Sequence, residues 1–264
     1  MDLVSQARAA AESPVKIRRF WNSGTEHRPP EWPIEADAGP DGRARLDEPY
    51  TILAQAANEF GESFLVLEIT ETGTSALKRL GRDAEPAVRQ ALQKLGHARA
   101  LALLRTGLIT AGQELLQQLF ELARQDPEII GALARTWKDL AFLEDSASGR
   151  KRCLEKSHEL YREAYEATKG IFPGINTAAT ALWLGKAELA VRLAREVAEN
   201  CRKQLAIRPQ DYWALATHAE GRLILRESAE ATQSYAQARA LVDQSHKWAN
   251  LASTRKQARR LCEK

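Results

Sequence analysis

The chain has 264 residues, of which 44% are hydrophobic and 28% are charged, and its formal net charge is +3. This composition is that of an ordinary folded protein, and so small a charge does not by itself indicate a nucleic-acid partner. No apolar run approaches the roughly 18 residues of a membrane-spanning helix, and the N-terminus lacks the apolar core of a secretory signal. The three cysteines lie far apart without a Cys-x-x-Cys pair, so we expect reduced thiols in a cytoplasmic protein.

Residues 1–48 are expected to form an N-terminal arm that is largely irregular. Residues 1–13 favour a short helix, whereas residues 20–49 contain five prolines and three glycines, which disfavour regular structure. We expect Trp21 and Trp32 to pin this segment against the rest of the protein. A disordered leader is the alternative.

Residues 49–264 are expected to form a helical repeat domain. Ala, Leu, Glu, Arg and Gln dominate this part of the chain, and all of them favour helices. The best strand candidate, residues 64–69, is read as a buried helical segment because the pattern around it is helical. A turn residue followed five positions later by a small residue recurs at intervals of 33 to 46 residues, near the roughly 34 residues of a tetratricopeptide unit. The turn residues are Gly61, Gly107, Arg152, Gly185 and Arg226.

These repeats predict an all-α, tetratricopeptide-like solenoid of about five helical hairpins plus a C-terminal capping helix near residues 246–262. Each hairpin alone has too little apolar surface, so stacking against its neighbours supplies the stability. Asp126 and Asp211 are available as N-caps. The first helices are expected near residues 49–59, 85–105, 126–143, 174–184 and 210–225. The second helices are expected near residues 62–77, 109–124, 150–168, 187–206 and 228–243.

One predicted helix is especially rich in small residues. The segment Phe172-Pro-Gly is expected to form a turn that leads into a helix over residues 175–184. Ala178, Ala179 and Ala181 would let a second helix approach closely, and Gly185 fits the left-handed position after a helix end.

Five blocks of the sequence carry a resemblance to a known family: Gly131–Leu140, Tyr161–Ala167, Phe172–Thr180, Asp211–Ala219 and Ser253–Gln257. Together they resemble the TRAF-binding tetratricopeptide region of the apoptosis signal-regulating kinases, and more closely its bacterial relatives. The resemblance covers about residues 85–262. It is most specific where the Pro-Gly-Ile-Asn block is followed by the Asp-Tyr-Trp block.

The resemblance implies an α-helical scaffold that binds other proteins, and the bacterial relatives imply a module of a sensing or conflict system. In this sequence no kinase or other effector follows residue 262, and residues 1–48 match nothing in the family. We therefore carry over protein binding alone and not the kinase-signalling role.

The inner surface of the stack, lined by the first helices, is the expected binding groove. Its candidate residues combine cations, an amide, a hydroxyl and aromatic rings, which suit a peptide or a helix of a partner. They are Arg135, Lys138, Asn176, Thr180, Tyr212 and Trp213.

Each of these interpretations has a purely structural alternative. The amide of Asn176 either holds a partner's backbone or satisfies backbone groups at the turn between hairpins. Arg135 and Asp139, four residues apart, either help to grip an acidic peptide or form a weak surface ion pair. Trp213 either contacts a partner or wedges between helices, as most tryptophans in such stacks do. The basic C-terminal helix is read as a solvated face, because no interleaved aromatic residues indicate nucleic-acid binding.

The sequence contains no pattern that indicates catalysis. It has no His-Glu-x-x-His, no Gly-x-Ser-x-Gly and no Walker loop. The five histidines are scattered, and none has metal-ligand spacing with a cysteine. We therefore expect neither an enzyme, nor a metal site, nor a cofactor.

The expected function is that of a non-catalytic scaffold or adaptor, as a subunit of a bacterial stress-sensing or conflict and defence system. Its partner is expected to be another protein, with self-association as an alternative; neither nucleic acid nor a membrane is expected. The alternative function is a regulator that binds a small anionic, nucleotide-like signal in the same groove, which basic and aromatic side chains would serve equally well.

Overall fold

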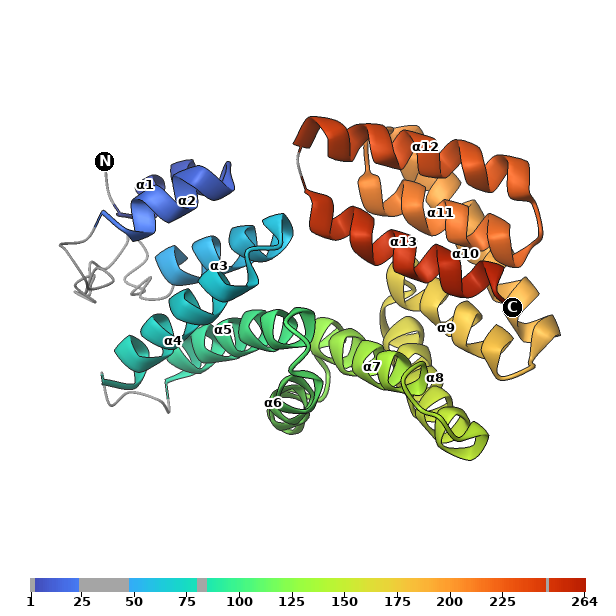
Figure 1. Ribbon diagram of the computed structural model, residues 1–264, viewed down its shortest axis with the longest axis horizontal. Helices are drawn as coiled ribbons and strands as arrows, with labels where there is room; N and C mark the ends of the chain where they lie inside the picture. The colour runs from blue at the N-terminus through green and yellow to red at the C-terminus, as the bar shows by residue number, and fades with distance from the viewer. Residues whose placement is uncertain (1–2, 24–47, 80–84, 246) are drawn as a thin grey trace. The chain divides into compact units, whose positions relative to one another are not determined.

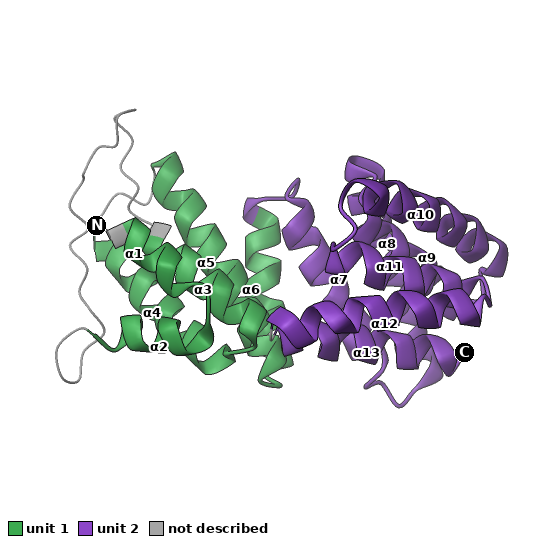
Figure 2. Ribbon diagram, turned by 90° about the horizontal axis from the view of Figure 1, so that it is seen from above, with its two compact units in different colours: residues 1–121 green, residues 122–264 purple. Residues whose placement is uncertain are grey.

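The structure, a computed structural model, describes residues 3–23, 48–79, 85–245 and 247–264. Within these ranges every regular element is an α-helix (Figure 1). Contacts divide the chain into two compact units, Met1–Glu121 and Leu122–Lys264 (Figure 2). Most of the predicted irregular arm, including Trp32, lies outside the described residues, and the predicted domain boundary after residue 48 stays a prediction.

Unit 1 begins with two short helices that pack into its core. Ser13 caps the second of them, because its Oγ accepts a hydrogen bond from the backbone N–H of Lys16 at 3.2 Å. This second helix was not predicted from the sequence, yet Ile17 and Trp21 are buried in the same apolar cluster as Leu53. In its described residues, unit 1 contains α1 (Leu3–Ala10), α2 (Pro14–Trp21), α3 (Glu48–Phe60), α4 (Ser63–Arg79), α5 (Pro86–Arg105) and α6 (Ile109–Leu122).

Unit 2 is a run of helices around a second apolar cluster, which includes five alanines of α9 and α10. Its described helices are α7 (Pro127–Ala141), α8 (Ala147–Thr168), α9 (Ile171–Trp183), α10 (Ala187–Ile207), α11 (Tyr212–Ile224), α12 (Ser228–Ser245) and α13 (Trp248–Cys262). The predicted helical-hairpin repeat is confirmed: α3 and α4, α5 and α6, α7 and α8, α9 and α10, and α11 and α12 are the five expected pairs.

The turns between paired helices follow the predicted chemistry, with one exception. Gly61, Gly107 and Gly185 have φ of 81°, 87° and 79°, the left-handed region in which glycine carries no steric penalty. Arg226, the last predicted turn residue, has φ of 64°. The predicted turn at Arg152 is wrong, because this residue lies inside α8, which already begins after the N-cap Ser146.

Helix α9 begins earlier than predicted. Pro173 and Gly174 belong to its first turn and not to a preceding turn, since Gly170 is the N-cap. A proline fits there because the first N–H groups of a helix have no partner within it. Ala178, Ala179 and Ala181 are fully buried, as expected for a helix that neighbours approach closely.

None of the helices in the described ranges is long and apolar enough to cross a lipid bilayer.

Candidate binding surface

Helices α7, α9 and α11, each the first helix of its hairpin in unit 2, contribute side chains to one small cavity. Arg135 and Lys138 come from α7, Asn176 comes from α9, and Trp213 comes from α11. The cavity encloses about 80 Å³, which is room for a few water molecules and not for a nucleotide. Its other wall comes from α13, the helix that the sequence predicts only as a cap of the stack.

Asp126 and Asp211 place the starts of α7 and α11. The Asp126 carboxylate accepts from the N–H of Glu128 at 2.9 Å, and Asp211 accepts from the N–H of Ala214 at 3.0 Å. Both predicted N-caps are therefore confirmed, and they fix which turns of α7 and α11 present side chains to the cavity.

Lys138 is a buried cation at the centre of this surface. Its Nζ donates to Oδ1 of Asn176 at 2.5 Å and to Oε1 of Gln257 at 3.0 Å, and it lies 5.5 Å from the centre of the Tyr161 ring. Burial lowers the pKa of Lys138, while the charges of Asp139 and Glu220 oppose that shift. The two amide oxygens thus replace the water that an ammonium would otherwise bind.

The side chain of Asn176 is hydrogen-bonded to other residues of this protein. While its Oδ1 accepts from Lys138, its Nδ2 donates to the backbone carbonyl of Phe172 at 2.9 Å. The side chain is therefore engaged on both sides, and only 3% of the residue is exposed.

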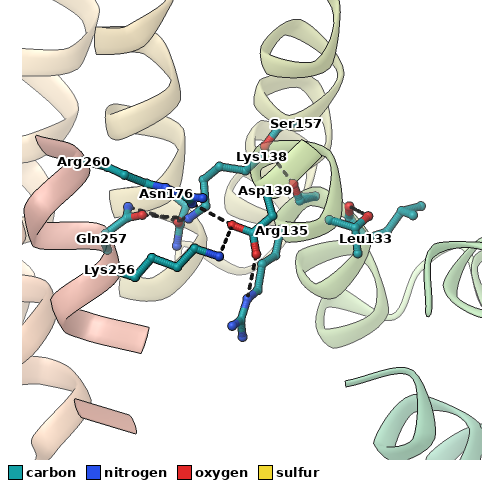
Figure 3. Close-up of polar contacts among 11 residues, drawn as sticks. Leu133, Arg135, Lys138, Asp139, Ser157, Asn176, Lys256, Gln257 and Arg260 are labelled. Carbon is teal, nitrogen blue, oxygen red and sulfur yellow. Dashed lines mark hydrogen bonds and ion pairs between the residues drawn. The ribbon is translucent and has the colours of Figure 1, made fainter. Parts of the chain in front are cut away.

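Asp139 holds two cations of α13. It accepts from Nη1 of Arg260 at 2.6 Å and lies 3.0 Å from Nζ of Lys256, while Arg135 on its own helix is 4.0 Å away. Burial alone would raise the pKa of Asp139, but the positive charges of Arg260 and Lys256 outweigh burial and hold this pKa below its usual value. Figure 3 shows Lys256, Gln257 and Arg260 reaching from α13 toward these residues.

Helix α13 makes further contacts along its length. The hydroxyl groups of Thr254 and Tyr212 are 2.7 Å apart, and the indole N–H of Trp183 donates to the carbonyl of Arg260 at 3.3 Å. The guanidinium of Arg260 also lies 4.0 Å from the centre of the Phe142 ring. Side chains of α7, α9 and α11 therefore all contact this one helix.

The remaining predicted residues occupy different environments. Trp213 lines the cavity and is 45% exposed, and its neighbour Tyr212 stacks edge-on against it with ring centres 5.0 Å apart. Thr180 is fully buried, where its Oγ1 lies 3.0 Å from Nδ1 of His158 on α8. Thr180 also donates to the backbone carbonyl of Asn176 at 2.8 Å, so it lies between α8 and α9, next to Asn176 but outside the cavity lining.

Glu220 and the α13 residues are part of the surface but were not among the predicted site residues. Glu220 is buried, and burial raises its pKa, against the opposing effects of Lys138 and of a hydrogen bond from Gln257. One signal for Glu220 exists in the sequence: it follows Trp213 and Thr217 at helical spacing and interrupts a run of small apolar residues. No local signal joins Arg260 to Asp139, 121 residues earlier.

The site contains one buried polar atom without a hydrogen-bond partner, the hydroxyl of Tyr161, whose residue lines the cavity. Among the described residues, no three histidine, cysteine or acidic side chains lie close enough to hold a metal ion. Burial raises the pKa of the Cys201 thiol to about 12, so this thiol is not an activated nucleophile.

Comparison with known proteins agrees with the helical-repeat architecture. A family model described as Tetratricopeptide Repeats-Sensor matches residues 74–182, which is less than half of the chain. No curated protein matches the sequence. Together with the five hairpins, the family match shows a tetratricopeptide-like helical repeat fold.

Two solved structures are similar at low sequence identity. A thermophilic TPR protein from Thermus thermophilus is 15% identical, with a TM-score of 0.49, over 75% of this chain and 99% of that chain. BtubC from P. vanneervenii is 17% identical, with a TM-score of 0.49, over 96% of this chain and 92% of that chain.

Proposed function

We propose that this protein is a non-catalytic scaffold that binds a helix or peptide of another protein on the inner surface of α7, α9 and α11. The observation that carries the proposal is that these three helices already bind a helix, α13, through side chains of each. A tetratricopeptide-like repeat fold is generally used for protein–protein interaction, and the match to a sensor family agrees with it.

The part of this surface that a partner can reach directly is its rim. Trp213 is 45% exposed and Phe172 is 46% exposed, and both line the cavity beside Arg135. Aromatic residues and arginine are the side chains most often responsible for binding energy in interfaces. The partner is therefore expected to cover Trp213 and Phe172 and to place an acceptor against Arg135.

The cellular setting is a further part of the proposal. The resemblance to bacterial relatives of the TRAF-binding tetratricopeptide region, together with the sensor family match, supports a subunit of a stress-sensing or defence system. Three free thiols support a reducing, cytoplasmic location.

The test is capture of partners from the native host by the tagged chain and by its Trp213→Ala variant. Loss of a large interfacial aromatic costs about 2 kcal/mol or more, so a groove-bound protein should fall at least about tenfold in the variant. Phe64→Ala, which removes an 80% exposed aromatic from unit 1, is the matched control and should retain that protein. A partner list unchanged by Trp213→Ala would contradict the proposal.

The alternative is a small anionic ligand in the same place. Arg135, Lys138, Lys256 and Arg260 supply cations, and the Tyr161 hydroxyl lacks a partner, but the carboxylates of Asp139 and Glu220 offset much of the charge. Because the cavity of about 80 Å³ has no room for a nucleotide, such a ligand would have to bind over its rim. Calorimetry with a panel of nucleotide messengers tests this, and the absence of heat from all of them would remove the alternative.

A further inference from the structure

We propose that α13 is a built-in ligand of unit 2, which occupies the surface that a partner's helix takes and must leave before that helix binds. The partner's helix then carries the chemistry of α13: two cations and one amide at the spacing of Lys256, Gln257 and Arg260. This inference rests on the proposed function and adds to it the kind of partner and the regulation of the site.

Helix α13 is held mainly by polar contacts. Its buried residues are Thr254, Gln257 and Leu261, three of fifteen, whereas eight of the thirteen residues of α9 are buried. Only Leu261 among these three is apolar. Because little apolar surface of α13 is buried, its release costs less hydrophobic free energy than the release of a helix such as α9 would cost.

The surface beneath α13 is specific for the side chains that it contacts. Asp139 needs cations, because it is largely buried and its charge is compensated by Arg260 and Lys256. Lys138 needs a hydrogen-bond acceptor, which the amide oxygen of Gln257 supplies at 3.0 Å. An acidic helix would face Asp139 and Glu220, and a purely apolar helix would deprive Lys138 of the Gln257 acceptor and Asp139 of the cations of α13.

Residues 256, 257 and 260 lie within about one turn of helix, so their side chains project from the same face of α13. Arg255 and Arg259 lie on the same helix but are exposed, and Arg259 pairs with Glu263 of the same chain end. The inward face of α13 therefore presents two cations and one amide in a fixed arrangement. The outward residues Arg255 and Arg259 take no part in these contacts.

Because α13 occupies the surface, an external helix can bind only to molecules in which α13 has left. The apparent dissociation constant of a competing helix equals its intrinsic value divided by the fraction of molecules in which α13 has left. Weakening the contacts of α13 should thus strengthen binding of an external helix, although the variant has lost favourable contacts of its own.

The experiment uses the full chain and a fluorescein-labelled peptide with the sequence of residues 247–264, measured by fluorescence anisotropy. The variant Lys256→Ala/Arg260→Ala should bind this peptide at least about tenfold more tightly than the unchanged protein does. Arg255→Ala/Arg259→Ala removes the same charge from the outward face of the same helix and should bind no more tightly than the unchanged protein. Adding Asp139→Asn to the first variant should abolish the gain.

Hydrogen exchange shows whether α13 has been released in each variant. In Lys256→Ala/Arg260→Ala, amides of residues 248–262 should lose protection while those of α9 and α10 keep it. Unchanged protection of α13 would overturn the proposal, because the ion pairs would not be what holds the helix. Equal peptide affinity in all variants, or no binding to a variant whose α13 is released, would overturn it too.

A natural partner separates this inference from the proposed function. If Trp213→Ala removes that partner but Lys256→Ala/Arg260→Ala leaves its affinity unchanged, the scaffold stands and the displacement of α13 is refuted. If the peptide experiment succeeds while every captured protein tolerates Trp213→Ala, the inner surface binds helices but is not the surface that partners use.

Discussion

At the scale of single residues, the centre of the site is a cation taken out of water. Lys138 has exchanged its hydration for two amide oxygens, those of Asn176 and Gln257, and for the ring of Tyr161. A buried charge is tolerated only while such partners remain, since an unpaired one carries the full cost of desolvation. The stability of unit 2 therefore depends on residues that the sequence suggests for partner binding.

Asn176→Ala tests this dependence. It removes one acceptor from Lys138 and one donor from the carbonyl of Phe172, so we expect unfolding to become easier by about 1–3 kcal/mol. In a Lys138→Met background the same substitution should cost clearly less, because no ammonium is left without an acceptor. Thermal or urea unfolding of the four proteins in this cycle measures the coupling. Equal costs in both backgrounds would show that the ammonium does not depend on Asn176.

At the scale of helices, much of the fold could be predicted because its signals are local. Asp126 and Asp211 cap the starts of helices, and glycines at 61, 107 and 185 end hairpin turns, each within a few residues of the element it controls. Helix α2 carries such a signal as well, Ser13 followed by Pro14, which the proline-rich segment after it obscured. The seating of α13 has no local signal, since its hydrogen-bond partners on α7, α9 and α11 are between 42 and 121 residues away.

Gly174 decides how closely α9 approaches its neighbours. A Cβ at this position would lie 2.7 Å from Cγ2 of Val197 on α10 and 2.8 Å from Cε2 of Tyr165 on α8. Gly174→Ala should therefore destabilise the protein by about 1–3 kcal/mol through overpacking, although alanine is the better helix former.

Gly131 of α7 is the matched control for this substitution. It also lies inside a helix of unit 2, and its Cβ would meet only Cε1 of Phe172, at an ordinary distance of 3.5 Å. Gly131→Ala should be neutral or stabilising by up to about 1 kcal/mol, from helix propensity alone. Melting temperatures compare the two variants, and a Gly174→Ala protein as stable as Gly131→Ala would refute the close-approach argument.

At the scale of the whole molecule, the described helices contain two separate apolar cores. One includes Leu53, Ile69 and Leu95 of unit 1, and the other includes Ile175 and Val197 of unit 2. Repeat proteins gain stability from each repeat and from its contacts with neighbours, so damage to one core is felt most by the helices that share it. The predicted binding residues all lie in unit 2, and the loss of α1 to α5 packing should leave their arrangement intact.

Paired core substitutions test this locality. Ile69 is fully buried in the first core, and Ile175 is 1% exposed in the second, so either isoleucine-to-alanine change should cost about 2–5 kcal/mol. In Ile69→Ala, hydrogen exchange should accelerate in α3, α4 and α5 while α9, α10 and α11 keep their protection; in Ile175→Ala the pattern should reverse. A uniform loss of protection in both variants would mean that the chain unfolds as one cooperative unit, and that a partner bound to unit 2 stabilises unit 1 as well.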